Sequence, residues 1–341
     1  MTTKKIIALK PFNNSVYYKN GIFNEHSEIG SFYVIAARKL LEKNNIIMNT
    51  IDISSNIGTV KDVYIEVPYP WELGLWLRII KSKKKNILFI GEPPLVNPFS
   101  FMKIFLFFFT KVYTWNDNLI DNKKYFKYVL PKKINNIEVT KVAFKNRRLL
   151  ILMNSNLAPF FPFQILSSST KELYTERVRA IDFFDKHYSS DFCLYGKGWN
   201  KRRKFSLKQR IFGFKKYKTY KGEFAQKDKY KILSEFRFSL CYENSTALGY
   251  VSEKIFDCFK AHIIPIYLGT TNIANYINPK CFIDFRKFKN YEDLMKFLKN
   301  MDVKTYNGYI AEIKKFLVSK ETYNIWSADT FAKTFLKAVM E

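Results

Sequence analysis

Short apolar runs alternate with amphipathic stretches along most of the chain, and this alternation restricts the fold more than any other feature. The first half predicts strands at 4–10, 46–53, 63–67 and 86–91, with helices at 28–43 and 71–83. Strands that alternate with helices in this way form parallel sheets covered on both faces. The second half repeats the pattern from residue 147 and ends in helices between residues 291 and 339. Since 341 residues are enough for two such domains, we predict doubly wound α/β domains at 1–145 and 146–341.

The formal net charge of +27 favours a polyanionic partner: an acidic lipid surface, an anionic glycolipid or a nucleic acid. A general bias toward Lys and Asn is an alternative origin of the charge. A basic nucleic-acid-binding protein is the competing hypothesis from another functional class. However, the chain contains no nucleic-acid motif, and its aromatic residues mostly follow core patterns. We therefore expect an anionic membrane surface, and no nucleic acid, as a partner.

The segment Phe99–Phe109 is intensely apolar but too short to span a bilayer. It is either a core helix or a segment that dips into a membrane surface beside Lys103 and Lys111. No run of about 18 apolar residues occurs, and the N-terminus does not resemble a signal peptide. These observations predict a cytoplasmic protein that is peripheral at the inner face of the cell membrane.

Metal-binding patterns are absent from the sequence. The four cysteines and three histidines are scattered, and no Asp-x-Asp pair occurs. We therefore predict no metal site, and we expect the cysteines to be buried free thiols.

One strand ends directly in a polar cluster. The apolar stretch Phe238–Tyr242 is followed by Glu243, Asn244 and Ser245, and Ser252-Glu-Lys254 then opens a helix. In α/β sheets, ligands bind at the carboxyl ends of strands and at the helix N-termini that follow. A lysine at such a helix start can neutralise a phosphate, and a carboxylate beside it can hold sugar hydroxyls. The alternatives are a solvated lysine and a helix capped by Ser252 or Glu253.

Four ordered segments of the second half resemble the donor-site motif of the α-1,3/α-1,4-fucosyltransferases. That family carries Phe-Glu-Asn-Ser, Tyr-Val-Thr-Glu-Lys, Val/Ile-Pro-Ile/Val-x-x-Gly and Pro-x-Ser-Phe-Ile-Asp. The corresponding segments here are Tyr242-Glu-Asn-Ser245, Tyr250-Val-Ser-Glu-Lys254, Ile264-Pro-Ile-Tyr-Leu-Gly269 and Pro279-Lys-Cys-Phe-Ile-Asp284. The resemblance implies a GT-B glycosyltransferase with two Rossmann-like domains facing a cleft. The implied reaction is inverting transfer of fucose from GDP-fucose to an acceptor oligosaccharide or glycolipid.

The resemblance also implies an acceptor in the N-terminal domain, such as a lipopolysaccharide side chain fucosylated through an α-1,3 linkage, and a reaction without an essential metal or cofactor. A transferase of the same fold that uses another nucleotide sugar remains an alternative, because no strand motif identifies the guanine or the 6-deoxy sugar.

The residues implied to bind the donor are Lys254, Tyr250, Arg202, Glu243, Asn244 and Ser252. The family places a phosphate-binding arginine after a glycine-rich turn, which here is Gly196-Lys-Gly198. Arg202 matches that position, and Arg203 matches it almost as well.

Two carboxylates are implied in catalysis. The strand Ile87–Ile90 ends in Gly91-Glu92, which matches a Gly-Glu strand end whose carboxylate is the family's base. Glu253 is implied to contact the donor sugar or ribose. The alternative for Glu92 is a strand-end carboxylate paired with a lysine.

Overall fold

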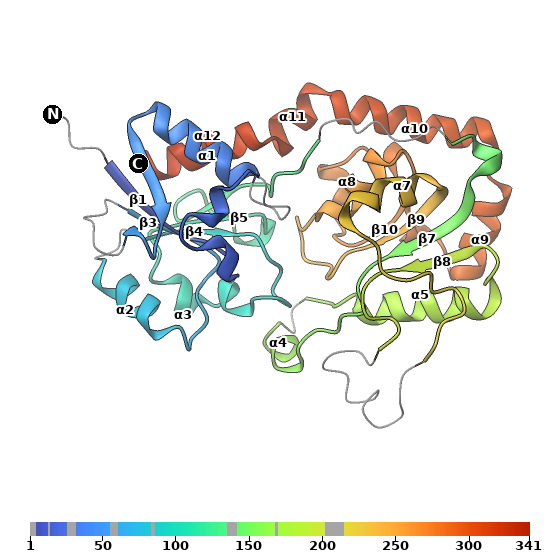
Figure 1. The fold of residues 1–341 in the computed structure, drawn as a ribbon, viewed down its shortest axis with the longest axis horizontal. Coiled ribbons are helices and arrows are strands. Elements are labelled where there is room, and N and C mark those ends of the chain that lie inside the picture. The colour runs from blue at the N-terminus through green and yellow to red at the C-terminus, as the bar shows by residue number, and fades with distance from the viewer. Residues whose placement is uncertain are drawn as a thin grey trace. The chain divides into compact units, whose positions relative to one another are not determined.

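The computed structural model describes residues 5–12, 14–25, 32–54, 61–82, 86–134, 142–167, 170–201 and 215–341. The chain forms two compact units, each an α/β arrangement built on one sheet (Figure 1). Unit 1 comprises Met1–Lys133 together with Lys320–Glu341, and unit 2 comprises Ile134–Ser319.

The sheet of unit 1 has the strand order β2-β1-β3-β4-β5-β6, and every pairing is parallel. Its strands are β1 (Lys5–Lys10), β2 (Ile46–Thr50), β3 (Lys61–Ile65), β4 (Asn86–Ile90), β5 (Lys111–Thr114) and β6 (Tyr125–Lys127). Its helices are α1 (Phe32–Lys43), α2 (Leu73–Lys81), α3 (Lys103–Leu106), α11 (Lys320–Trp326) and α12 (Ala328–Met340). The chain runs from β1 outward to β2 and then returns to the other side of β1, so the order reverses between β1 and β3. Ligand sites of doubly wound sheets lie outside the carboxyl ends of the strands at such a reversal.

The sheet of unit 2 has the order β11-β10-β9-β7-β8 and is also parallel throughout. Its strands are β7 (Arg148–Met153), β8 (Phe192–Tyr195), β9 (Phe236–Tyr242), β10 (Ile264–Leu268) and β11 (Ile283–Asp284). Its helices are α4 (Phe161–Leu166), α5 (Tyr174–His187), α7 (Lys229–Ser234), α8 (Glu253–Lys260), α9 (Tyr291–Asn300) and α10 (Val303–Val318). The order reverses between β7 and β9, which makes the end of β9 the counterpart of the end of β3.

The predicted domain division is wrong at the C-terminal end of the chain. Helix α12 packs on α1, and its Phe331 and Phe335 lie in the core of unit 1. The ring of Phe89 from β4 stacks on Phe335, with 5.2 Å between the ring centroids. The amphipathic pattern of α12 predicts a helix with one apolar face, but it does not indicate which sheet buries that face. The N-terminal stretch of unit 1 also ends at Lys133 instead of residue 145, and residues 135–141 lie outside the described ranges.

The apolar segment Phe99–Phe109 is divided between the core and the surface of unit 1. It is a 3₁₀ turn at Pro98–Phe101 followed by the short helix α3, instead of one core helix. Phe99, Leu106 and Phe109 are buried in unit 1, whereas Ile104 and Phe107 are exposed.

Within the described ranges, no helix is both long and apolar enough to cross a membrane. All four cysteines are buried and free, as the sequence predicts.

Candidate functional site

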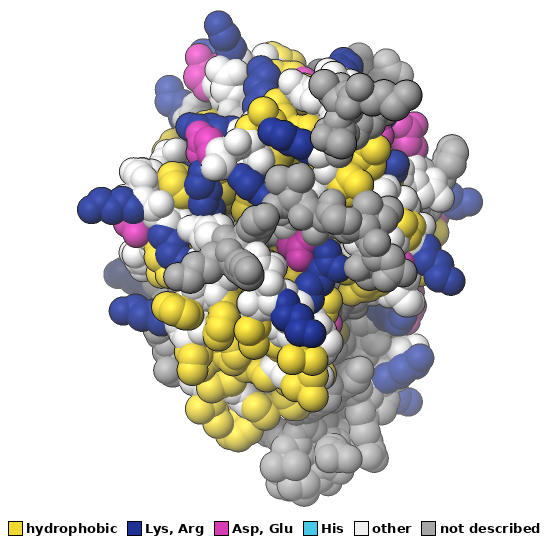
Figure 2. Space-filling model, turned by 90° about the vertical axis from the view of Figure 1, so that its left-hand side faces the viewer, with side chains coloured by type: hydrophobic (Ala, Val, Ile, Leu, Met, Phe, Trp, Pro, Cys, Tyr) yellow, Lys and Arg dark blue, Asp and Glu magenta, His cyan; other side chains and the backbone are white. Residues whose placement is uncertain are grey.

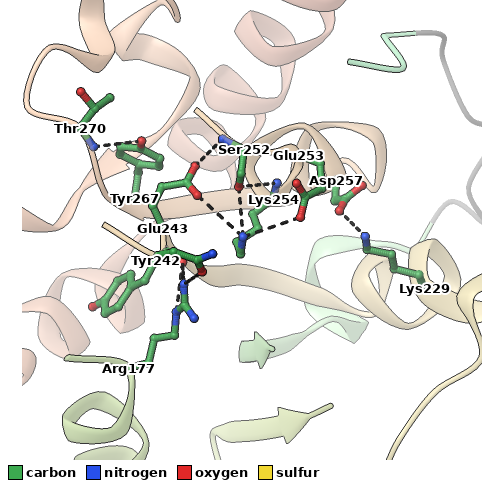
Figure 3. Close-up of polar contacts among 11 residues, drawn as sticks. Arg177, Lys229, Tyr242, Glu243, Ser252, Glu253, Lys254, Asp257, Tyr267 and Thr270 are labelled. Carbon is green, nitrogen blue, oxygen red and sulfur yellow. Dashed lines mark hydrogen bonds and ion pairs between the residues drawn. The ribbon is translucent and has the colours of Figure 1, made fainter. Parts of the chain in front are cut away.

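The carboxyl end of β9 places a fully buried glutamate at the chain reversal of unit 2. Burial of Glu243 is complete, and its Oε1 accepts a hydrogen bond from the backbone N–H of Ser252 at 2.8 Å. Its Oε2 lies 3.8 Å from Nζ of Lys254. A buried carboxylate is costly unless it is bonded and faces a positive charge. Glu243 meets both conditions, because the loop after β9 returns the start of α8 to the end of the strand (Figure 3).

Lys254 lies in the first turn of α8, where the backbone N–H groups and the helix dipole favour an anion. Ser252 is the N-cap, and its Oγ accepts from the backbone N–H of Lys254 at 3.4 Å and from its Nζ at 3.1 Å. Nζ also lies 3.7 Å from Oε1 of Glu253, a largely exposed side chain. Burial lowers the pKa of Lys254, but the carboxylates of Glu253 and Glu243 outweigh it and hold the pKa above its ordinary value. The ammonium group therefore keeps its charge at neutral pH.

Gly269, directly after β10, leaves the space that Glu243 occupies. A Cβ atom at Gly269 would lie 2.6 Å from Cγ of Glu243 and would also overlap with the ring of Tyr267. The glycine that ends the Ile-Pro-Ile-x-x-Gly segment is therefore explained by close packing around the buried carboxylate.

Arg177 is a buried cation of this site that the sequence analysis missed. It projects from α5, and its guanidinium donates to the carbonyl of Tyr242 at 2.9 Å and to Oδ1 of Asn244 at 2.8 Å (Figure 3). Burial lowers the pKa of Arg177, but an arginine remains charged in proteins. A detectable signal was present, because Arg177 occupies the buried stripe of α5 that also contains Tyr174 and Phe184.

A pocket of 440 Å³ opens beside these residues in unit 2. Its walls include Asn154, Gly196, Lys197, Arg177, Asn244, Lys229, Glu253, Lys254, Asp257 and Cys258. Gly196 has a φ of 138°, and a Cβ there would overlap with the carbonyl of Asn154, so this turn after β8 requires glycine. The two charged residues Lys229 and Asp257 form an ion pair at the wall (Figure 3). Several cationic side chains and the main chain of the Gly196 turn therefore line the pocket at the carboxyl end of the sheet.

The residues predicted for the donor site fall into four groups. Asn244, Glu253 and Lys254 line the pocket, whereas Glu243 and Ser252 support Lys254. Tyr250 is buried and is not among the described residues that line the pocket. Arg202 and Arg203 lie outside the described residues.

Glu92, the predicted base, lies in unit 1 two residues after the end of β4. Its backbone N–H donates to Oε1 of Glu66 at 2.7 Å, and the same oxygen accepts from Gly91 N at 2.5 Å. Oε2 of Glu66 accepts from Oγ of Ser100 at 2.7 Å. Glu66 follows β3 and has a φ of 70°, a strained value for a residue other than glycine. Such strain concentrates at functional sites.

Ionisable groups gather around these two glutamates at the chain reversal of unit 1. Burial raises the pKa of Glu66 to about 7, and the charge of Glu92 adds to this effect. Burial also raises the pKa of Tyr33, with further contributions from Glu92 and Glu66. The Lys10 side chain at the end of β1 is buried, and burial lowers its pKa although Glu72 and Glu66 oppose the change. The predicted base therefore belongs to an acidic cluster that the sequence did not reveal.

Among the described residues, no group of three or more His, Cys, Asp or Glu side chains could hold a metal ion.

A family model described as "Glycosyltransferase family 10 (fucosyltransferase) C-term" matches residues 166–336, half of the chain. The α-(1,3)-fucosyltransferase FucT of Helicobacter pylori is 42% identical over 73 residues. That match covers 21% of this chain and 15% of the H. pylori protein, so it spans only a small part of the relative's length.

Solved structures extend the likeness to the whole chain. A crystal structure of an α1,3-fucosyltransferase matches with a TM-score of 0.59 at 15% identity and covers 99% of this chain and 90% of its own. A crystal structure of an α1,3-fucosyltransferase with GDP-fucose matches with a TM-score of 0.54 at 16% identity, over 100% and 92% of the two chains. At this identity the likeness shows the fold alone, and it confirms the expected GT-B class.

Proposed function

Because the chain belongs to glycosyltransferase family 10, the fucosyltransferases, we propose that it transfers fucose from GDP-fucose to a hydroxyl of an acceptor glycan. The observation that carries this proposal is the position of Lys254. Its ammonium group lies at the start of α8, at the wall of a pocket, with its charge kept by Glu243 and Glu253.

The pocket of unit 2 is the proposed donor site. A diphosphate there would meet Lys254, the N-terminus of α8 and the cationic groups of Arg177 and Lys197. These groups favour the negative charge that accumulates on GDP as it departs. Glu253 is the carboxylate we propose for contact with a hydroxyl of the sugar or ribose, because its largely exposed side chain lies at the pocket wall.

The proposed chemistry is a single displacement. The acceptor oxygen attacks the anomeric carbon of the β-linked donor, the bond from that carbon to the diphosphate breaks, and GDP leaves with the electron pair. Glu92 takes the proton of the acceptor hydroxyl. The attack inverts the anomeric carbon and yields an α-fucoside. The glutamates at the end of the unit 1 sheet support this role, because they provide carboxylates in the part of the chain assigned to the acceptor.

We further infer that the donor site needs no divalent metal, since lysine, arginine and a helix N-terminus can neutralise the diphosphate. The acceptor we propose is a surface glycan such as a lipopolysaccharide side chain, joined through an α-1,3 linkage. Transfer would then take place in the cytoplasm, at the inner face of the cell membrane.

The test is incubation of the purified protein with GDP-fucose and a panel of acceptor glycans. We expect GDP release and a product heavier by one fucose. The variant Lys254→Ala should lose both, whereas the matched control Lys296→Ala, an exposed lysine of α9, should retain them. Turnover with another nucleotide sugar but not with GDP-fucose would contradict the donor assignment. A linkage analysis of the product then tests the α-1,3 bond and the inversion.

A further inference from the structure

Helix α2 leaves one apolar face without a partner in unit 1. Its inner face is satisfied, because Ile79 is buried and Trp76 packs against Phe105 with 5.3 Å between the ring centroids. Leu73, Leu77 and Ile80 recur at helical spacing on another face, and their side chains are between 57% and 69% exposed. An amphipathic helix normally buries its apolar face, so this exposure needs a reason.

Helix α3 extends the same apolar surface. The rings of Phe105 and Phe108 contact Trp76, so α2 and α3 pack together. Ile104 of α3 and Phe107, the residue that caps the C-terminus of α3, are 67% and 68% exposed.

Aromatic contacts hold the border of this surface in place. Trp71, which is 64% exposed, stacks on Tyr69 at 4.7 Å and meets the edge of Phe99 at 6.1 Å. We call the six exposed residues Trp71, Leu73, Leu77, Ile80, Ile104 and Phe107 the α2–α3 patch. In Figure 2, a broad apolar area occupies the lower part of the surface that faces the viewer. Contiguous exposed apolar surface of this kind marks an interaction site on a soluble fold.

The charges beside the patch identify the kind of partner. Lys81 and Lys103 are exposed at the ends of α2 and α3, and Nζ of Lys124 lies 3.5 Å from the carbonyl oxygen of Phe107. The charge of Arg78 is neutralised by Asp62 at 2.8 Å, so these lysines dominate the border. Long cationic side chains around apolar groups suit an anionic lipid surface, where the ammonium groups meet phosphates and the apolar groups enter the acyl boundary. A tryptophan at the edge suits the same interface.

A second copy of this chain is the weaker occupant. The sequence carries a net charge of +27, so two copies that met through faces bordered by lysine would repel each other. The same charge attracts the chain to acidic lipid.

We propose that the α2–α3 patch docks the protein on an anionic membrane surface, with its apolar side chains inserted to the depth of the lipid headgroups. The apolar segment Phe99–Phe109 then has two functions. Its buried members complete the core of unit 1, and its exposed members contact lipid. The proposal does not depend on the donor or the acceptor, since it rests on exposure and charge in unit 1.

The test is flotation of the full chain with liposomes of phosphatidylcholine alone and of phosphatidylcholine with phosphatidylglycerol. We expect binding only to the anionic liposomes, and a loss of binding as salt increases. The variant Leu77→Gln/Phe107→Gln should bind at least about tenfold more weakly. The charge variant Lys81→Gln/Lys103→Gln/Lys124→Gln should lose about 10²-fold, since each lysine near an acidic surface contributes about fivefold. Both variants change exposed or half-buried side chains, and their circular dichroism should match that of the parent protein.

A matched control is Phe161→Gln/Ile165→Gln, which removes two exposed apolar side chains from α4 in unit 2. It should bind liposomes as the parent does. If the α4 variant loses binding and the α2–α3 variant keeps it, the proposal is wrong. Equal binding to neutral liposomes would also overturn it. The proposal would likewise be wrong if the protein bound no liposomes but self-associated, and if Leu77→Gln/Phe107→Gln abolished that self-association.

Quenching by brominated lipid locates the contact. Trp71 is exposed, whereas Trp115, Trp199 and Trp326 are buried and Trp76 is half-buried. Brominated lipid should quench the fluorescence of the bound protein, and Trp71→Phe should remove most of that quenching. Bound protein without quenching would show that another surface contacts the membrane, and would overturn the assignment.

Discussion

The two units bury a glutamate at the same topological place and use it differently. Glu66 follows β3 and Glu243 follows β9, so each lies where the strand order of its sheet reverses. Glu66 accepts from two backbone N–H groups of the next strand end and from the hydroxyl of Ser100. Glu243 accepts from the backbone of Ser252 and faces the ammonium group of Lys254.

This difference indicates that the buried glutamate has a different role in each of the two sheets. In unit 1 the buried carboxylate fixes the backbone of Gly91 and Glu92, and thereby the position of a second carboxylate. In unit 2 it helps keep a cation charged at a pocket wall. We therefore expect chemistry to depend on unit 1 and donor affinity on unit 2.

Glu92→Gln should produce the largest loss of activity and should distinguish the role of unit 1 from that of unit 2. The amide keeps the shape of the side chain but cannot take the proton of the acceptor. Transfer should fall by about 10² to 10⁴, while GDP affinity stays nearly unchanged. A transfer assay beside calorimetry with GDP measures both quantities.

The control for Glu92→Gln is Glu321→Gln, an exposed carboxylate of α11 in the same unit. It should keep the parental rate. If Glu92→Gln also keeps that rate, Glu92 is not the base and Glu66 becomes the next carboxylate to test.

Lys254→Ala should weaken donor binding and transfer together, because an unneutralised diphosphate penalises the ground state and the transition state alike. We expect a loss of about 10² or more in kcat/KM, with a matching loss of GDP affinity by calorimetry. Lys296→Ala serves as the control. Normal GDP affinity in a folded Lys254→Ala protein would contradict the expectation that donor affinity depends on this part of unit 2.

Glu66 should make the stability of the protein depend on pH. Its folded-state pKa of about 7 exceeds its ordinary value of 4.5, so between these values the folded protein holds a proton that the unfolded chain has released. The corresponding stability is present at low pH and is lost as the pH rises through 7, by about 3 kcal/mol in total. Urea unfolding between pH 5 and 8 should therefore show a downward slope that Glu66→Gln flattens. If Glu66→Gln shows the same slope as Glu321→Gln, the pH dependence of stability comes from other groups.

Chelation should have the smallest effect. We expect activity to survive EDTA, because lysine, arginine and a helix N-terminus lie at the proposed donor pocket of unit 2. A metal ion could still accelerate GDP departure, so a modest change in rate is compatible with this prediction. Complete loss of activity that a metal ion restores would contradict it.

The sequence predicted the parts of the site that are local in the chain. Glu243 and Lys254 belong to one strand, loop and helix start, and the polar cluster at the end of β9 indicated both. Strand and helix periodicity likewise gave the two parallel sheets. The short strands β5 and β6 of unit 1 went unpredicted, because three or four residues carry little periodic signal.

Contacts between distant segments could not be predicted. Arg177 meets Asn244 across 67 positions of the chain, and Glu66 meets the backbone of Glu92 across 26 positions. The contact of Glu66 is to main-chain N–H groups, which have no signature in the sequence of the partner. Its burial and its raised pKa follow from how β3 and β4 lie side by side.

The return of α12 to unit 1 has a consequence for synthesis on the ribosome. Phe331 and Phe335 fill the core that the early strands begin, yet they are translated only after the whole of unit 2. Unit 2 is contiguous in the chain and can fold while translation continues. Unit 1 cannot complete its core until α12 has been translated, so its apolar surface stays exposed until then. Chaperones would therefore meet the N-terminal strands of the nascent chain for longest. A stop codon shortly before Ala328 would leave a first unit that cannot complete its core, even though every residue proposed for catalysis is present.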